Sequence, residues 1–220
     1  MNAAVPIEKG QEAARGEYIA FLDPTDRFVP QKIQIQLTRM QNVGSLLSHT
    51  SYHVVFPERF PDIGAMFAGR LTGHAYPQVI EDCPVVASTV MINRYLVDAG
   101  FAFPEDAAAG AASLWISVCR EHEILGVDEM LSVIEWSSAS DMINIEKSIA
   151  ARRSLIVELM KDKLHNRQIV AIGRLASRHQ NLLKLVAAET KGRAQPSQPL
   201  LDEALIRLAF PTEPVPLPLA

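Results

Sequence analysis

Two carboxylates follow a short apolar run near the N-terminus. Residues 16–27 read GEYIAFLDPTDR, in which Asp23 and Asp26 lie three residues apart with a proline and a threonine between them. Carboxylate oxygens suit hard divalent cations, and such a cation is often held by only one or two carboxylates together with substrate phosphates. The same residue types also form turns and cap helices. The pattern therefore indicates either a metal site or a turn.

The segments around the two carboxylates predict a strand between two helices. Residues 7–15 read as the end of a helix with Gly16 as its stop, and residues 18–22 as a buried strand. Pro30 opens the next helix. Its apolar residues at helical spacing are Ile33, Leu37 and Met40. Open α/β sheets bind ligands beyond the carboxyl ends of their strands, so the carboxylates lie where a ligand would bind.

Further elements alternate along the chain. We expect strands over 45–56, 84–92 and 124–133, and helices over 93–99 and 111–122. Residues 57–83 carry several prolines and glycines and read as a long, partly helical excursion. Apolar spacing between 140 and 191 predicts a helical hairpin, and a proline-rich tail follows. The expected domains are therefore 1–138, 139–193 and 194–220.

Composition excludes several classes of function. The net charge is −4 and the basic residues are scattered, so we expect no nucleic-acid partner. Cys83 and Cys119 lack the paired spacing of a zinc or redox site and read as buried thiols in a reducing compartment. No apolar run is long enough to span a membrane, so we expect a cytoplasmic protein. Basic residues at 152–153 and 161–163 read as a solvated helix face or as a peripheral contact with the inner membrane surface.

Three segments carry a family resemblance. KGQEAARGEYIAFLDPTDRFVPQKIQIQ (9–36) resembles the middle of the family-two glycosyltransferases, which have the GT-A fold. CPVVASTVMINRYLVDAGFAFPED (83–106) is similar to their acceptor-side strand and helix, and residues 114–115 to the start of their last helix. Together these segments cover roughly residues 7–135. The resemblance implies an α/β, Rossmann-like GT-A domain and sugar transfer from a nucleotide-sugar donor to a saccharide acceptor, in polysaccharide or glycoconjugate synthesis.

The resemblance also assigns roles to particular residues. Asp23 and Asp26 match two of the three acidic positions that, in the family, hold Mg²⁺ or Mn²⁺ and the donor diphosphate. Ser88 and Thr89 lie in the segment that is similar to the acceptor-side strand and could touch an acceptor sugar, although a buried strand pair is an equal alternative. Trp115 corresponds to a residue that could stack on a sugar ring, but its spacing with apolar neighbours also fits a core position.

Several positions depart from the family pattern. Thr25 replaces the middle aspartate, and residues 7–8 read Ile-Glu where an arginine and an asparagine are usual. Residues 110–111 read Gly-Ala in place of an acidic pair, which leaves Asp106 as the candidate substitute base. These changes remove charges that the chemistry of the family uses.

The resemblance begins partway through the family domain. The first strands of the family's parallel sheet, and the residues that build its nucleotide pocket, have no counterpart in this chain, so we expect a truncated GT-A domain with an open sheet edge. Either a protein partner covers this edge, or the chain is a remnant of a longer ancestor. Two functions remain open. The first is sugar transfer, and the second is a non-catalytic interaction or scaffold subunit derived from a glycosyltransferase, that is, a pseudoenzyme.

Overall fold

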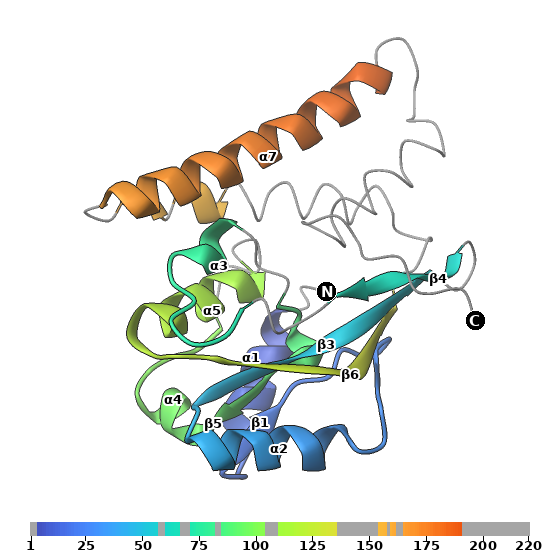
Figure 1. Cartoon of the computed structure of the whole chain (residues 1–220), viewed down its shortest axis with the longest axis vertical. Coiled ribbons are helices and arrows are strands. Elements are labelled where there is room, and N and C mark those ends of the chain that lie inside the picture. The colour runs from blue at the N-terminus through green and yellow to red at the C-terminus, as the bar shows by residue number, and fades with distance from the viewer. Residues whose placement is uncertain are drawn as a thin grey trace.

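The computed structural model describes residues 4–56, 60–66, 71–81, 85–103, 110–135, 154–157, 159–161 and 165–190. Within these residues the centre is a six-stranded sheet in the order β1-β5-β3-β6-β2, with β4 paired to β3 (Figure 1). Its strands are β1 (Tyr18–Ala20), β2 (Arg27–Phe28), β3 (Leu47–Phe56), β4 (Phe60–Met66), β5 (Met91–Asn93) and β6 (Leu125–Glu135). The sheet with its helices confirms the expected α/β class.

The strand directions bring three carboxyl ends to one edge of the sheet. β3 and β6 pair in parallel, whereas β5 pairs antiparallel with both β1 and β3. β1, β3 and β6 therefore run in the same direction. The turn at 23–26 follows β1, and it meets the end of β6 where the Glu135 amide donates to the Asp26 carboxylate. The carboxylates thus lie at the edge where the sequence predicted a ligand.

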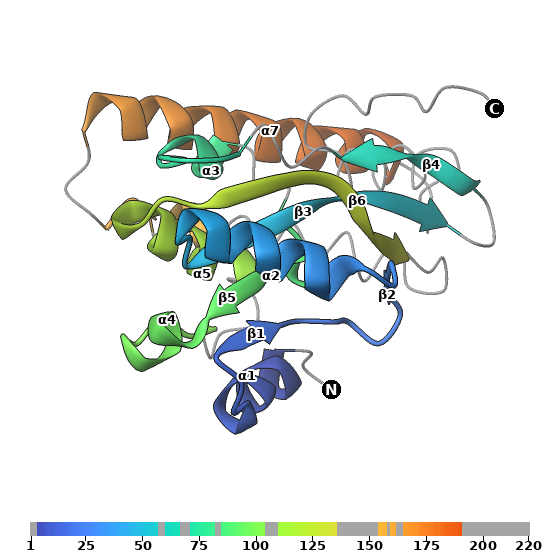
Figure 2. The same ribbon diagram turned by 60° about the horizontal axis from the view of Figure 1, so that its bottom comes forward.

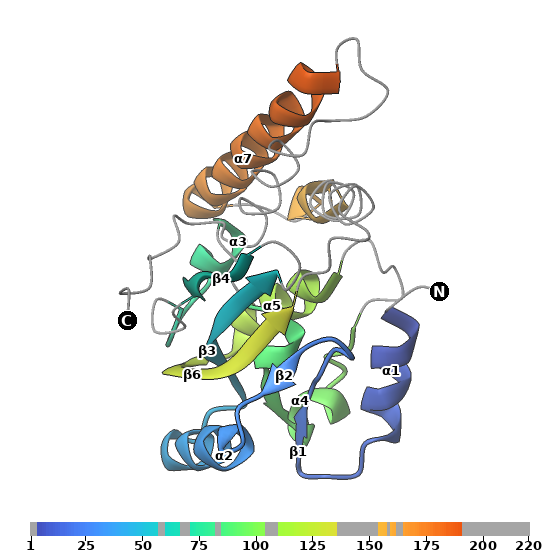
Figure 3. The same ribbon diagram turned by 90° about the vertical axis from the view of Figure 1, so that its right-hand side faces the viewer.

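Two helices cover opposite faces of this sheet (Figures 2 and 3). Successive residues of a strand point to opposite faces, and β3 shows which helix lies on each. The Ser48 hydroxyl accepts a hydrogen bond from Gln36 of α2 (Lys32–Val43), while the adjacent Leu47 joins the apolar cluster that includes Trp115 of α5 (Gly110–Glu121). The other helices are α1 (Ala4–Ala13), α3 (Gln78–Glu81), α4 (Arg94–Asp98) and α7 (Asn166–Thr190).

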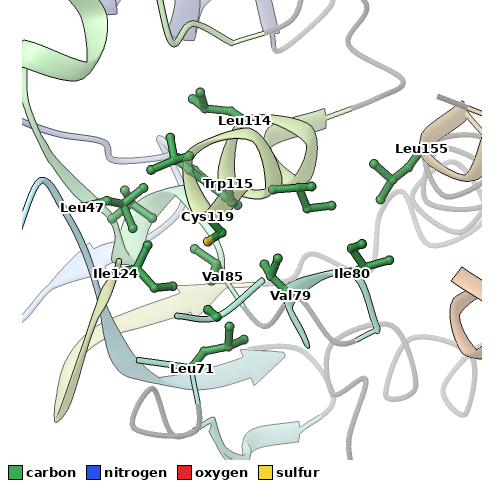
Figure 4. Packing of buried hydrophobic residues seen from close by; sticks show 14 of the residues in the cluster. Leu47, Leu71, Val79, Ile80, Val85, Leu114, Trp115, Cys119, Ile124 and Leu155 are labelled. Carbon is green, nitrogen blue, oxygen red and sulfur yellow. The ribbon is translucent and has the colours of Figure 1, made fainter. Parts of the chain in front are cut away.

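The face under α5 holds the apolar core (Figure 4). Trp115 is 1% exposed, and its ring lies 5.5 Å from the Phe103 ring and 6.3 Å from the Phe21 ring, measured between centroids. Cys119 is buried in the same cluster, as expected, whereas Cys83 lies outside the described residues. Burying this much aromatic and aliphatic surface is the main stabilising contribution to the fold.

α2 confirms the helix predicted after Pro30, but most of its buried side is polar. Its buried residues are Lys32, Gln36 and Met40, whereas Ile33 is 43% exposed. Apolar periodicity identified the helix and the buried Met40 correctly, but it could not show that a polar network holds most of the buried side. The helix ends at Gly44, whose φ of 67° is left-handed and whose amide donates to the Met40 carbonyl.

Two other elements differ from the sequence prediction. The strand expected over 84–92 begins only at Met91, because residues 87–89 form a short 3₁₀ helix, η2 (Ala87–Thr89). The Thr89 hydroxyl and the Thr89 amide both donate to the Val86 carbonyl, which is the local bonding that draws serine and threonine out of strands. In the excursion at 57–83, β4 was not predicted.

The first helix also ends earlier than expected. α1 stops at Ala13, and Gly16 is not its stop, since its φ is not positive. The Arg94 guanidinium instead donates to the carbonyls of Ala14 and Gly16 and holds this connection in place. In contrast, the short helix α4 is confirmed, with Asn93 as its N-cap and Gly100 at a φ of 92° just beyond it.

The C-terminal part is described in pieces. α7 confirms a long helix in the second half of the predicted hairpin, and it packs on α3, where the Gln168 amide donates to the Tyr76 hydroxyl at 2.6 Å. Residues 136–153 and 191–220 lie outside the described residues. The hairpin and the three domain boundaries therefore stay predictions. No helix in the described part of the chain has the length and apolar character needed to cross a bilayer.

Candidate active site

Asp23 forms the turn that links β1 to β2. Its carboxylate Oδ1 accepts from the Thr25 amide at 3.2 Å and from the Thr25 hydroxyl at 3.0 Å, and its carbonyl accepts from the Asp26 amide. Thr25 thus closes the turn instead of supplying a third carboxylate. The Asp23 side chain is exposed. The turn alternative is therefore correct for the backbone, and it leaves the Asp23 carboxylate at the surface.

Asp26 faces inward from the same turn. It is 8% exposed, and its Oδ1 accepts from the Glu135 amide at 3.0 Å. Burial raises the pKa of the Asp26 carboxyl, and the nearby charges of Asp23 and Glu135 raise this pKa further, while hydrogen bonds from Ser88 and Glu135 oppose the rise. Burial and the neighbouring acidic charges therefore disfavour the ionised form of Asp26, and a bound cation would favour it.

Ser88 connects the two aspartates. Its hydroxyl oxygen accepts from the Asp23 amide at 2.9 Å, and the same hydroxyl is hydrogen-bonded to the Asp26 carboxylate. From β6, the Ser132 hydroxyl donates to the Ser88 carbonyl at 2.9 Å. Ser88 and Thr89 are both fully buried. Ser88 is thus a buried residue that bonds to both aspartates, a role that the sequence did not predict.

The remaining predicted residues do not gather at this turn. Trp115 is buried among aromatic side chains in the core, which favours the core alternative over a sugar-stacking role. Asp106 lies outside the described residues, so its role as a base stays a prediction. The Gly-Ala pair at 110–111 begins α5.

The donor set at the turn fits a hard divalent cation. In the described part of the chain no group of three or more histidine, cysteine or acidic side chains could hold a metal ion. Two carboxylates are nevertheless sufficient where substrate phosphates and water complete the coordination, as is usual for Mg²⁺. Asp23 offers an exposed oxygen donor, and Asp26 offers a second carboxylate from the same turn.

Sequence reasoning missed two buried polar residues near this site. Lys32 is 0% exposed, and its Nζ donates to the Gln36 Oε1 at 2.5 Å and to the Thr89 carbonyl at 3.1 Å. Burial lowers the pKa of Lys32 to about 7. Its spacing of four residues from Gln36 was the available signal, since these positions lie one turn apart on the same helix face.

Curated relatives are glycosyltransferases. The chain is 38% identical over 133 residues to an uncharacterized glycosyltransferase of Rickettsia conorii, which covers 60% of this chain and 22% of that protein. It is 26% identical over 165 residues to TuaG of Bacillus subtilis, whose name assigns it to teichuronic acid biosynthesis, covering 74% of this chain and 64% of TuaG. The chain therefore spans about a fifth of the length of the Rickettsia relative. No family model matches the chain.

Solved structures confirm the fold. The chain superposes on Staphylococcus aureus TarS 1-349 in complex with UDP-GlcNAc with a TM-score of 0.59 and 15% identity, covering 94% of this chain and 62% of TarS 1-349. At this identity the likeness shows the fold alone. Together with the relatives, it confirms the resemblance to family-two glycosyltransferases and the predicted GT-A-type fold. The predicted α/β fold class and the glycosyltransferase-like character of the chain are both confirmed.

Proposed function

We propose that this chain is the part of a nucleotide-sugar glycosyltransferase that binds the donor diphosphate, in the synthesis of a polysaccharide or glycoconjugate. One observation carries the proposal. Asp23 and Asp26, joined through Ser88, lie at the carboxyl edge of a GT-A-type sheet, where an open α/β sheet binds ligands. The nucleotide-sugar complex of TarS and the names of the relatives support this choice of substrate class.

Asp23 and Asp26 would hold Mg²⁺ or Mn²⁺ together with the diphosphate. The metal would supply neutralisation of the charge that develops on the nucleoside diphosphate as it leaves. The chain itself fixes the two carboxylates: Thr25 orients Asp23, while Ser88 and the Glu135 amide orient Asp26. This fixed arrangement lowers the cost of ordering the site when a ligand binds.

The acceptor side of the proposal rests on Asp106. A base must remove a proton from the acceptor hydroxyl, and the acidic pair usual in the family is absent at 110–111. Asp106 comes just before α5 in the chain, so it is our candidate for this base. The acceptor would be a saccharide or a lipid-linked saccharide, met at the cytoplasmic membrane surface.

A second function follows from the edge of the sheet. Among the described residues β1 pairs only with β5, and it ends the strand order. An edge strand offers unpaired backbone groups to another segment or chain. A protein partner that pairs with β1 would make the chain an interaction subunit, and the missing acidic pair at 110–111 favours this alternative.

Calorimetric titration tests the proposed function. UDP, and then a panel of UDP- and GDP-sugars, is added to the folded protein with and without Mn²⁺. We expect Mn²⁺-dependent binding of UDP that Asp23→Asn weakens at least about tenfold, which corresponds to about 1.4 kcal/mol. Asp98→Asn, the same change at an exposed carboxylate at the end of α4, is the matched control and should leave the affinity unchanged.

Asp26→Asn separates binding from stability. This change keeps an oxygen that accepts from the Glu135 amide but removes a buried charge. Because burial raises the pKa of Asp26, its ionised form weakens the fold at neutral pH, so the variant should be at least as stable as the wild type. It should nevertheless lose Mn²⁺-dependent binding. Absence of binding by any nucleotide to the folded wild-type protein would reject the catalytic function for this chain and favour the interaction subunit.

A further inference from the structure

Buried hydrogen bonds join α2 to η2, and a further hydrogen bond joins η2 to the carboxylate turn. It begins at Lys32 and Gln36, which lie one turn apart on the buried face of α2. The Lys32 ammonium lies 4.9 Å from the centre of the Phe28 ring, and its Nζ donates to Gln36 and to the Thr89 carbonyl. None of these atoms belongs to the carboxylate pair itself.

The Thr89 carbonyl is the point where α2 holds the 3₁₀ turn. It accepts from Lys32 Nζ at 3.1 Å and from Gln36 Nε2 at 3.0 Å. Gln36 Nε2 also approaches the Ser48 hydroxyl at 2.9 Å and the Ser48 carbonyl at 3.2 Å, which anchors it to β3. One carbonyl therefore receives two side-chain donors from the same helix face.

η2 in turn fixes the position of the two aspartates. Ser88 precedes Thr89 in η2, and its own carbonyl is held from β6 by the Ser132 hydroxyl. With its backbone fixed from both sides, the Ser88 hydroxyl has a defined position from which it bonds to the Asp23 amide and to Asp26. A rigid supporting shell of this kind is what keeps functional side chains in a productive geometry.

We propose that Lys32 and Gln36 are positioning residues of the carboxylate site: through the Thr89 carbonyl they fix the turn that carries Ser88, and Ser88 fixes Asp23 and Asp26. The proposal rests on the proposed function for its effect on ligand binding, but its structural part holds for the protein without any ligand. The hydrogen bonds of the buried Lys32 ammonium go to uncharged acceptors, on Gln36 and Thr89. A buried cation held in this way weakens the fold rather than supporting it, so stability alone does not explain it.

The structural part is tested by hydrogen exchange in the free protein. The Asp23 amide donates to Ser88, so its exchange rate reports the position of the Ser88 hydroxyl. We expect Lys32→Met to speed exchange of the Asp23 amide about tenfold or more while the free energy of unfolding at pH 7 is unchanged or higher. Gln36→Met provides a second variant with the same expected change in exchange. Gln11→Met is the control, because Gln11 is equally buried but bonds to the Phe101 carbonyl, away from η2.

A double-mutant cycle tests whether the effect passes through Ser88. If Lys32 acts by way of Ser88, then Lys32→Met should add little to the faster exchange already caused by Ser88→Ala. Additive effects, or an Asp23 exchange rate in Lys32→Met equal to that of the wild type, would overturn the proposal.

Binding of UDP with Mn²⁺ provides the functional readout. Lys32→Met should weaken this binding about tenfold without loss of stability, whereas a merely structural residue would lower both together. Unchanged affinity in a variant with faster Asp23 exchange would also overturn the positioning role. If the wild-type protein binds no UDP, the proposed function fails, and the exchange experiment still decides the structural part.

Discussion

The two faces of the sheet are packed in opposite ways. Under α5 the buried side chains are aromatic and aliphatic, with Trp115, Phe21 and Phe103 at its centre. Under α2 two of the three buried helix side chains are polar, and these two, Lys32 and Gln36, reach hydrogen-bond partners on η2 and β3. The two helices are of equal length, each with 12 residues, so the difference lies in what they bury.

This contrast indicates that the two faces contribute to the structure in different ways. Apolar burial is favourable and non-directional, so the α5 face stabilises the fold without fixing any particular atom. Hydrogen bonds contribute less to stability but are directional, and a buried donor without a partner is costly. The α2 face therefore specifies one arrangement of the turn that carries Ser88, at some cost in stability.

The largest effect should come from the α5 face. Trp115→Ala should lower the free energy of unfolding by about 3–5 kcal/mol, because it removes a fully buried aromatic side chain and leaves a cavity. Urea denaturation measures this change. Trp115→Phe is the control: it keeps most of the packing and removes the indole Nε1, which has no hydrogen-bond partner, so its effect should be much smaller. Equal losses in both variants would contradict the packing explanation.

On the α2 face, the buried Lys32 should instead make the stability of the protein depend on pH. Burial lowers the pKa of Lys32 from 10.5 to about 7, so between these values the unfolded chain binds one more proton than the folded chain. The protein is therefore more stable at high pH, where Lys32 is neutral. Its free energy of unfolding falls by on the order of a few kcal/mol as the pH drops toward 7.

Lys32→Met should remove this pH dependence. Relative to the wild type, the variant should therefore gain more unfolding free energy at pH 7 than at pH 9.5. Urea denaturation at both pH values measures this. His49, whose pKa burial lowers to about 4, adds a separate rise in stability between about pH 4 and 6.5 in both proteins. A difference that is the same at pH 7 and 9.5 would show that Lys32 is not buried as described.

The smallest effect concerns one hydrogen bond on the α2 face. Ser48→Ala removes one acceptor from Gln36 Nε2, which keeps the Ser48 and Thr89 carbonyls as partners, so the loss should be about 1 kcal/mol. Ser117→Ala on α5 is the matched control. Among the described residues the Ser117 hydroxyl bonds within its own helix, to the Ser113 carbonyl, so thermal unfolding should show almost no change. A larger loss at Ser117 than at Ser48 would contradict the contrast between the faces.

Local patterns predicted the elements whose stabilisation is local or apolar. The α5 helix was predicted because Leu114, Trp115 and Val118 repeat at helical spacing, and these residues are buried. α4 was predicted from its cap and its terminal glycine. The strand at 84–92 was predicted from its apolar composition and begins later, because the hydroxyl of Thr89 bonds to its own backbone.

The candidate site was predictable only in part. The aspartates were found because the motif is contiguous in sequence. The hydrogen-bond partners of the aspartates were not found, since Ser88 lies 65 residues from Asp23 and Glu135 lies 109 residues from Asp26. Lys32 was missed for a related reason: its partner Thr89 is 57 residues away, and without that partner a lysine is expected at the surface.

The sequence by itself determined the α/β fold class, the apolar face of α5, and the turn that carries Asp23 and Asp26. These features depend on side-chain type and short-range spacing, which a sequence states directly. Only the tertiary structure decided that Asp26 is buried and that Ser88 bonds to both aspartates. It also decided that Lys32 and Gln36 donate to the Thr89 carbonyl of η2. The physical reason is that a buried polar group is tolerated only where its partner lies, and the fold brings these partners together from distant parts of the chain.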